Sequence, residues 1–497
     1  MSTSPTDPHL PAVHLRPPRN WINDPNGLVF HAGHYHVFFQ YNPHGPQHAN
    51  MHWGHYRSPD LITWEPLPVA LAPTPGGYDA DGCFSGNAIS TGDRMVAFYS
   101  AHRNDRWWQP VTTAESHDNG HTWAKRPDLL IPEPPAGTTM YRDPYVWRQN
   151  ERWRMLVGSA LDDGRAAALL YESEDLEHWT YRGPFHTSDT AAAAGPIGWE
   201  CPQYATFGDR NALILSDWTP QGGPSHTTVV TGREKDEGGF EAVTAPVPLD
   251  HGPDFYAPAL LKAPGEDRWL MWGWAWEARD DAWAHETGWA GVLTLPREVT
   301  LNADGTVAQR PARELLALRG PRVLHGTGYA TQTEPAELGQ IGHTFDLTAA
   351  VVPDPTGTSG LRLITSADGS EHLDISLDPT AGHLVVDRTH ASTDARARGG
   401  VYTAPCPAAT RPNTPVELRV IVDRSIAEVY LADEQVLTLR FYPSTDGPWQ
   451  LQARTTGAGR GEFAVAAWNL TAESLPPRSP TGGPGNAGRL IPGPHKP

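Results

Sequence analysis

The chain has 497 residues, which is too long for one hydrophobic core and predicts two or three domains. Its 48 glycines and 49 prolines are about a fifth of the chain, and this excludes a helix-dominated protein because both residues destabilise helices. A net charge of −19 without a basic run argues against a nucleic-acid partner, and three widely spaced cysteines exclude a disulfide scaffold or a cysteine-built zinc site.

Neither a signal peptide nor a transmembrane segment is visible in the sequence. The first 20 residues lack a charged segment followed by an apolar one, and no apolar stretch approaches the ~18 residues that cross a membrane. We therefore expect a cytoplasmic protein with no membrane partner. Residues 1–13 are expected to be a disordered N-terminus.

A short phrase recurs along the first half of the chain and indicates an internal repeat. Each copy begins with Ser, has Asp two residues later and ends on Trp, and the copies are almost evenly spaced at 58–64, 116–123 and 173–179. One further period falls on 231–240, a degraded copy with Phe in place of Trp. Trp64, Trp123 and Trp179 sit in this repeated turn, so we expect them to pack one unit against the next.

Every repeat also contains one very apolar second strand. These strands are predicted at 35–41, 95–100, 153–158, 212–216 and 269–274. Four short strands in a unit of about 50 residues are typical of a propeller blade. The sequence therefore predicts an all-β protein in which residues 14–312 form a five-bladed β-propeller, with the first strand of each blade innermost.

The pattern changes after Pro311. Residues 313–324 are predicted to be a linker with one short helical turn. From 325 to 472 apolar and polar residues alternate between turn clusters, as in 372–377 and 416–422, which predicts a β-sandwich. The Pro/Gly-rich residues 473–497 are predicted to be a disordered tail.

Three acids precede the apolar strands of their repeats at a similar distance. They are Asp24 in WINDPNG (21–27), Asp143 in YRDP (141–144) and Glu200 in WECP (199–202). A single Asp-Pro usually caps a turn, but three acids at one position of a propeller repeat project into the same end of its channel. Neighbouring carboxylates raise one another's pKa, which gives one protonated acid and one ionised group, as glycoside hydrolysis requires.

Aromatic residues near the unit openings support a sugar-binding pocket, because the C–H faces of sugar rings pack on aromatic planes. The candidates are Trp21, Trp53, Phe84, Tyr256, Trp274 and Trp289. The histidines show no metal-ligand spacing, so we predict neither a metal nor another cofactor.

The ordered motifs resemble glycoside hydrolase family 32, the β-fructofuranosidase group of invertases, sucrose-6-phosphate hydrolases, inulinases and levanases. These motifs are WINDPNG (21–27), FFQYNP (38–43), MHWGH (51–55), GCFSGNAI (82–89), YRDP (141–144), WECP (199–202) and FYAP (255–258). The resemblance runs from about residue 14 to 470, and the family fold, a five-bladed propeller plus a sandwich, agrees with the repeat pattern.

The resemblance implies a role for each matching residue. Asp24 would be the nucleophile, Glu200 the general acid and then base, and Asp143 the group that holds the fructose hydroxyls. Asn23, Gln40, Trp53, Ser85 and Arg142 would line the fructose subsite, with Phe84 and Tyr256 as walls. Trp274 is a further predicted substrate-binding residue. The reaction would be hydrolysis of a small fructoside with retention, and Cys201 would either tune the pKa of Glu200 or be an inert buried thiol.

The sequence leaves the substrate open between sucrose, sucrose 6-phosphate and short fructooligosaccharides. Arg103, Arg106 and Arg279 are candidates to bind a phosphate at the pocket rim, and Ala259 stands where the family often has Gln. Alternatives are a fructosyltransferase on the same scaffold, an inverting pentose-releasing glycosidase and a catalytically silent sugar-binding propeller. WINDPNG and FSGNAI argue against the second, and the presence of both Asp24 and Glu200 argues against the third. Two subunits pairing through the sandwich is a further open alternative.

Overall fold

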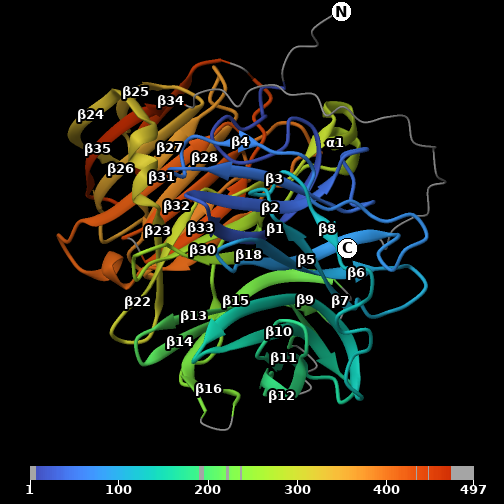
Figure 1. Ribbon diagram of the computed structural model, residues 1–497. Coiled ribbons are helices and arrows are strands. Elements are labelled where there is room, and N and C mark those ends of the chain that lie inside the picture. Colours follow the sequence, from blue (N-terminus) through green and yellow to red (C-terminus); the bar gives the residue numbers. More distant parts are fainter. Residues whose placement is uncertain are drawn as a thin grey trace, which may run out of the picture.

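The computed structural model describes residues 7–189, 195–219, 223–235, 238–432, 434–445 and 447–471. Within them the chain forms two all-β parts, a propeller and a sandwich, which confirms the predicted fold class (Figure 1). The blue-to-green propeller lies beside the yellow-to-red sandwich. The predicted tail at 473–497 lies outside the described residues.

The described part of the propeller contains five sheets, one for each predicted repeat, and each predicted apolar segment is the second strand of its sheet. The first three sheets are β1 (Asn20–His31), β2 (His34–Asn42), β3 (His52–Ser58) and β4 (Glu65–Pro66) with β20 (Trp289–Ala290); β5 (Gly82–Ser90), β6 (Met95–His102), β7 (Val111–Ser116) and β8 (Ala124–Lys125); and β9 (Thr138–Gln149), β10 (Arg152–Leu161), β11 (Ala166–Ser173) and β12 (Thr180–Thr187). The last two are β13 (Gly198–Phe207), β14 (Arg210–Thr219), β15 (Gly223–Glu234), β16 (Phe240–Ala242) and β17 (Val247–Pro248); and β18 (Phe255–Lys262), β19 (Trp269–Ala275), β21 (Val292–Leu293), β22 (Arg297–Leu301) and β23 (Val307–Pro311).

The first strands of the five sheets form a closed inner ring, in which β1 contacts β5 and β18, and β9 and β13 complete the circle. The tryptophans of the repeated turn join neighbouring sheets farther out. Trp123 meets Phe38 of the first sheet edge to face with 5.4 Å between ring centroids, and Trp179 meets Phe98 of the second sheet at 6.0 Å. Trp64 meets Trp272 of the fifth sheet at 6.4 Å and so closes the circle. The predicted packing role of these tryptophans is confirmed.

The sandwich consists of two six-stranded antiparallel sheets with an apolar core between them. The first contains β24 (Arg319–Thr331), β35 (Arg460–Leu470), β26 (Thr344–Val352), β31 (Val416–Asp423), β32 (Ile426–Leu431) and β33 (Gln435–Arg440). The second contains β25 (Ala336–Ile341), β34 (Trp449–Thr455), β27 (Ser359–Ile364), β28 (His372–Asp378), β29 (His383–Asp387) and β30 (Val401–Pro405). Helical segments are short: α1 (Asp281–Thr287) and the 3₁₀ helices η1 (Arg313–Leu318) and η2 (Pro407–Thr410).

The structure differs from the prediction in two segments, the predicted linker 313–324 and the predicted disordered N-terminus 1–13. The segment 313–324 is not a linker throughout, because it forms η1, which buries Leu315 and Leu318, and then begins β24 at Arg319. Strand β24 lies at a sheet edge and is mostly exposed, so it lacks the alternating pattern that marks a half-buried strand.

Of the predicted disordered N-terminus, residues 7–13 are ordered against the sandwich. The amides of Ala12 and Val13 donate to the buried Asp423 carboxylate at 2.8 Å, and His9 Nε2 lies 2.8 Å from the carbonyl oxygen of Pro443. A buried carboxylate needs such donors, and this contact between distant parts of the chain leaves no local sequence signal. Residues 1–6 lie outside the described residues.

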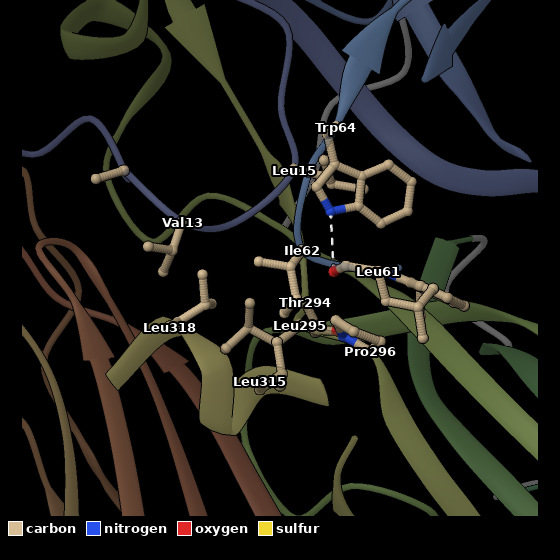
Figure 2. Close-up of a pocket in the computed structure, with 12 residues that line it drawn as sticks. Val13, Leu15, Leu61, Ile62, Trp64, Thr294, Leu295, Pro296, Leu315 and Leu318 are labelled. Carbon is tan, nitrogen blue, oxygen red and sulfur yellow. Dashed lines mark hydrogen bonds between the residues drawn. The ribbon is translucent and has the colours of Figure 1, made fainter. Parts of the chain in front are cut away.

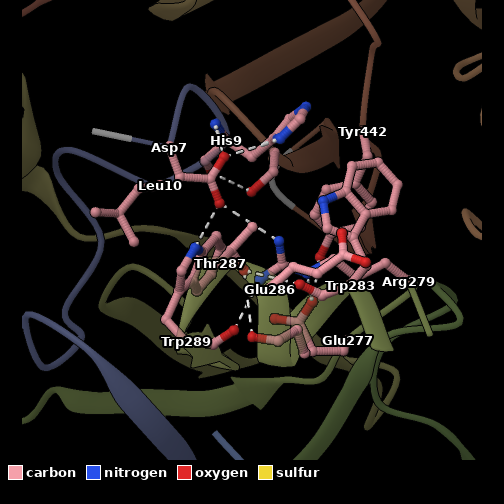
Figure 3. A network of polar contacts seen from close by, with 12 residues as sticks. Asp7, His9, Leu10, Glu277, Arg279, Trp283, Glu286, Thr287, Trp289 and Tyr442 are labelled. Atoms are coloured by element: carbon pink, nitrogen blue, oxygen red, sulfur yellow. Dashed lines mark hydrogen bonds and ion pairs between the residues drawn. The ribbon is translucent and has the colours of Figure 1, made fainter. Parts of the chain in front are cut away.

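Buried ion pairs join the propeller to the sandwich. Arg297 of β22 donates to Glu428 of β32 at 2.7 Å and to Asp250 at 2.8 Å, and all three side chains are at most 1% exposed. Figure 3 shows a second group, in which Arg279 pairs with Glu277 at 2.9 Å and the hydroxyl of Tyr442 in the sandwich donates to Glu277 at 2.6 Å. The two parts are thus held by charge pairs as well as by apolar contact.

A small cavity of about 30 Å³ lies where η1 meets the first and fifth sheets. Leu15, Leu61, Trp64, Leu315 and Leu318 line it, and none of its lining residues carries a titratable side chain (Figure 2). It is a packing gap with room for about one water molecule, not a catalytic pocket. Among the described residues, no helix has the length and apolar character needed to cross a membrane.

Candidate active site

β-Bulges in the inner strands position the predicted site residues. In β9, β13 and β18 the pairing with the second strand shifts at the same point, after Arg142, Glu200 and Tyr256. The next residues, Asp143, Cys201 and Ala257, have positive φ angles of 60°, 46° and 46°, and a proline follows each of them. A bulge lets two successive side chains serve the same face of a strand, so Arg142 and Asp143 both reach the axis.

This register corrects the prediction that the three acids share one position of the repeat. Glu200 occupies the position of Arg142, and the residue that matches Asp143 is Cys201. Glu200 and Asp143 therefore differ by one position in the repeat. Because of the bulge, both positions still face the same site. Gly158 of β10 lets β13 approach closely, because a Cβ at this position would lie 2.4 Å from the carbonyl oxygen of Trp199 in β13.

Asp24 and Asp143 meet around the Cys201 thiol. Ser85 Oγ donates to Asp24 Oδ2 at 2.6 Å, and Cys201 Sγ lies 3.8 Å from the same oxygen. The sulfur also lies 3.6 Å from Asp143 Oδ2, which accepts the Cys201 backbone N–H at 3.2 Å. Burial raises the pKa of Cys201 well above its ordinary value, so the thiol stays protonated and can donate to one carboxylate.

Glu200 lies between Arg142 and Tyr256. Arg142 Nη1 is 2.9 Å from Glu200 Oε1, and Arg142 Nε is 3.5 Å from Asp143 Oδ2. The Tyr256 hydroxyl lies 2.9 Å from Glu200 Oε2, to which it donates. Asp24, Asp143 and Glu200 are therefore linked through Arg142 and Cys201 into one cluster.

Burial raises the pKa values of two acids in this cluster, because the nearby cation does not fully compensate their charges. Burial raises the pKa of Glu200 to about 7; Arg142 opposes this rise, and Asp143 and Asp24 reinforce it. Burial also raises the pKa of Asp24, although the Ser85 hydroxyl opposes it. Glu200 is thus a proton donor below neutral pH, as a general acid requires.

The predicted binding residues lie beside these acids or behind the strand that carries Ser85 and Phe84. Asn23 Oδ1 accepts from Trp21 at 2.7 Å, and Gln40 donates to the Cys83 carbonyl oxygen at 3.0 Å. Trp53 is fully buried and donates to the Phe84 carbonyl oxygen at 3.0 Å, so it supports Phe84 from behind.

The aromatic predictions lie on the same surface. The Phe84 ring lies 5.6 Å from the Arg142 guanidinium, and Trp274 packs at 5.6 Å from Trp21. Tyr256, Trp274 and Cys201 belong to one apolar cluster, which Phe84 also contacts. The structure therefore brings all eleven predicted site residues into one region.

Sequence reasoning missed four residues here. His102 stacks on Phe84 at 4.2 Å, His48 meets Phe84 edge to face at 5.7 Å, and Trp276 stacks on Tyr256 at 5.5 Å. Asp217 is buried, which raises its pKa to about 7, and its carbonyl oxygen lies 3.3 Å from the Tyr256 hydroxyl. Asp217 could have been found from the sequence as an acid at the end of an apolar strand. His102, His48 and Trp276 show no such sequence signal.

Two of the arginines predicted as phosphate-binding candidates, and the predicted pocket aromatic Trp289, are engaged elsewhere. Arg279 is fully buried between Glu277 and Asp7, and Trp289 donates to Asp7 at 2.6 Å. The Arg279 guanidinium also lies 5.1 Å from the Tyr442 ring, and the Trp289 ring lies 5.4 Å from the Arg440 guanidinium, so both belong to the contact with the sandwich. Arg106 donates to the carbonyl oxygens of Tyr78 and Ala101 at 2.7 and 3.0 Å.

Arg103, the third arginine candidate, forms an ion pair with Asp105 at 2.6 Å. No group of three or more His, Cys, Asp or Glu suited to a metal ion occurs in the part of the chain that the structure describes.

The chain is similar to known proteins over most of its length. Residues 14–311 match the glycosyl hydrolases family 32 N-terminal domain, and residues 314–468 match the C-terminal domain of that family. A raffinose invertase of Escherichia coli is 34% identical over 88% of this chain and 90% of its own, and a sucrose-6-phosphate hydrolase of Zymomonas mobilis is 31% identical over 88% and 87%.

Solved structures show the same fold. Fructan 1-exohydrolase IIa of Cichorium intybus has a TM-score of 0.84 at 24% identity, covering 95% of this chain and 99% of its own. A family 32 β-fructofuranosidase of Bombyx mori has a TM-score of 0.79 at 25% identity, covering 95% of each chain. The chain therefore belongs to glycosyl hydrolases family 32.

Proposed function

We propose that Asp24, Glu200 and Asp143 catalyse hydrolysis of unphosphorylated sucrose-type fructosides. As a family 32 member the protein is a retaining β-fructofuranosidase, which releases terminal β-D-fructosyl residues. The observation that carries the assignment of roles is the difference in contacts. The Ser85 hydroxyl donates to Asp24 and opposes the burial that raises its pKa, whereas burial raises the pKa of Glu200 to about 7 although Arg142 opposes it.

In the first step Asp24 Oδ attacks the anomeric carbon of the fructosyl group while Glu200 gives its proton to the departing glycosidic oxygen. The electron pair of the broken C–O bond stays with that oxygen, and a fructosyl ester of Asp24 forms. The Ser85 hydroxyl at 2.6 Å orients the attacking carboxylate. Arg142 at 2.9 Å holds the Glu200 carboxylate and neutralises the charge left when the proton departs.

In the second step the ionised Glu200 takes a proton from water, whose oxygen attacks the same carbon and displaces Asp24. Two displacements at one carbon give net retention. Asp143 holds the sugar: its Oδ2 accepts the Cys201 amide, whereas Oδ1 is buried with no hydrogen-bond partner among the described residues. A fructose hydroxyl that donates to this oxygen would satisfy it, and the bond strengthens as positive charge develops on the ring.

The contacts of the three candidate arginines favour an unphosphorylated substrate, because each arginine is already paired within the protein. Arg279 is buried, Arg106 donates to backbone carbonyls and Arg103 is paired with Asp105. A phosphate would have to displace these partners in a chain of net charge −19. The 34% identity with a raffinose invertase also supports a neutral saccharide.

A hydrolysis panel with the purified protein tests the proposal. Sucrose, sucrose 6-phosphate, raffinose, 1-kestose, inulin and levan are compared by kcat/KM. We expect fructose release with sucrose at least as good a substrate as its 6-phosphate. A preference for the phosphate, or release of a pentose without fructose, would contradict the proposal.

Three predictions accompany it. A fructosyltransferase on this scaffold would make kestose-type oligomers at high sucrose, which chromatography of the same reactions detects. We expect hydrolysis to dominate.

Cytoplasmic location and subunit pairing through the sandwich stay predictions. Cell fractionation tests the first, and light scattering of the purified protein tests the second.

A further inference from the structure

One tryptophan stands apart from the other eighteen. All nineteen lie in described residues, and Trp107 is the one that is exposed, with 53% of its surface open to solvent. It lies in the connection between β6 and β7, next to Trp108, whose ring is 5.4 Å away and whose Nε1 donates to the Pro132 carbonyl oxygen. An exposed indole has a cost in water that a partner would remove.

The connection that carries Trp107 is held firmly. Arg103 Nη1 donates to the Gly77 carbonyl oxygen at 3.0 Å, and Arg106 Nη2 donates to that of Tyr78 at 2.7 Å. The amide of Asn104 donates to Asp81 at 2.9 Å. The indole therefore projects from a fixed backbone, which lowers the entropy lost when a ligand stacks on it.

Both ends of the connection border the carboxylate cluster. At its start, His102 stacks on Phe84, which lies against Arg142. At its end, the amide of Gln109 donates to the carbonyl oxygen of Tyr141, the residue before Arg142.

Unpaired polar atoms mark the same two ends. His102 Nδ1 and Gln109 Oε1 are buried without hydrogen-bond partners among the described residues, and Gln109 as a whole is only 6% exposed. Buried polar atoms of this kind are normally satisfied. An aromatic face beside unpaired donors and acceptors is the combination that binds a sugar ring.

We propose that Trp107 binds the second sugar ring of the leaving group, the one that a trisaccharide has and sucrose lacks. This inference rests on the proposed function, because Glu200 marks the leaving-group side by protonating the departing oxygen. The first leaving-group ring lies beside Arg142, Phe84 and His102, where His102 Nδ1 can contact it. Trp107, five residues farther along the chain, stacks on the next ring, which is galactose in raffinose and glucose in 1-kestose.

Steady-state kinetics of Trp107→Ala on sucrose, raffinose and 1-kestose test the inference. We expect kcat/KM for both trisaccharides to fall about three- to tenfold, the effect of losing one aromatic stacking contact. The value for sucrose should change less than about twofold, since its leaving group ends at the first ring. Trp107→Phe keeps an aromatic face and should retain most of the trisaccharide activity.

The matched control is Tyr329→Ala, which removes an aromatic side chain of similar exposure, 57%, from the sandwich. It should leave all three substrates unchanged. An equal loss on sucrose and on the trisaccharides, or no change on any of them in a folded variant, would overturn the role of Trp107. Neither result would touch the proposed function, which fails only if the wild-type protein releases no fructose from these substrates.

Discussion

Two clusters of buried carboxylates in this protein show opposite acid–base behaviour. At the contact with the sandwich, Arg297 and His14 lie 2.7 and 3.1 Å from the Glu428 oxygens. Burial opposes the charge of Glu428, but these cations lower its pKa to about 2. In the candidate active site burial prevails, and the pKa of Glu200 rises to about 7.

The difference lies in the number of cations, since both clusters are buried. Among the described residues, Arg142 is the only cation paired with the site acids, and it pairs with Asp143 and Glu200 but not with Asp24. At the interface both ring nitrogens of His14 face carboxylates, at 2.9 Å for Asp423 and 3.1 Å for Glu428. Carboxylates only accept, so His14 must carry both protons there. Fully paired acids hold the two parts together, and underpaired acids remain available for proton transfer.

The largest effect is expected from Asp24→Asn, which removes the nucleophile. Turnover of sucrose should fall by at least about a thousandfold, because no ester intermediate can form. Asp60→Asn, in the repeated turn of the same sheet, is the control and should keep its activity. Turnover within tenfold of wild type would remove Asp24 from the mechanism.

Glu200→Gln is expected to lose activity according to the leaving group. Sucrose hydrolysis should fall by about 10²- to 10⁴-fold, because its leaving oxygen needs a proton. A fructoside with an aryl leaving group needs less protonation, so formation of the ester should lose much less. Pre-steady-state release of the aryl group measures that step, and an equal loss on both substrates would contradict the acid role.

Glu428→Gln should change stability rather than chemistry. It leaves Arg297 and His14 without their shared carboxylate, which costs about 3–5 kcal/mol of unfolding free energy near neutral pH. The depressed pKa means that this contribution is present above about pH 4.5 and is lost as the pH falls toward 2. Denaturant titration at several pH values measures it, and an unchanged midpoint at pH 7 would show that the pair adds no stability.

The smallest effects concern pH. Because Glu200 must be protonated, kcat/KM should decline above a pH of about 7. On the acid side, the decline of kcat/KM should occur above the ordinary pKa range of an aspartate, because burial raises the pKa of Asp24.

The raised pKa of Glu200 also lowers the free energy of unfolding as the pH rises from 4.5 through 7. Glu200→Gln should therefore stabilise the fold at pH 8 by about 1–3 kcal/mol and leave it unchanged at pH 4. Destabilisation at pH 8 would contradict the comparison of the two clusters.

The repeat was visible in the sequence because local chemistry produces it. The turn phrase of Asp60 and Trp64 is made by contacts two or three residues apart, such as Asp60 accepting from the Thr63 amide and Trp64 donating to the Leu61 carbonyl oxygen. Equivalent contacts recur in the copies that end on Trp123 and Trp179, so the period of the repeat and its apolar second strands could be predicted from the sequence.

Features made by distant contacts could not be predicted. The order of residues 7–13 depends on Asp423, and the burial of Arg279 depends on Asp7 and the ring of Tyr442, so neither segment shows these partners locally. The offset between Glu200 and Asp143 follows from bulges, which shift pairing without changing composition. The place of the three acids ahead of the apolar strands was enough to predict them, and the family resemblance supplied their roles. His102 became visible only when its stacking on Phe84 was known.

The most direct test of the account is to trap the fructosyl ester. Glu200→Gln is incubated with the aryl fructoside, which can form the ester without an acid but cannot hydrolyse it quickly without a base, and the digested protein is analysed by mass spectrometry. The account predicts one added fructosyl group on the peptide that contains Asp24, and none in the Asp24→Asn, Glu200→Gln double variant. A fructosyl group on any other residue, or a label that survives in the double variant, would contradict it.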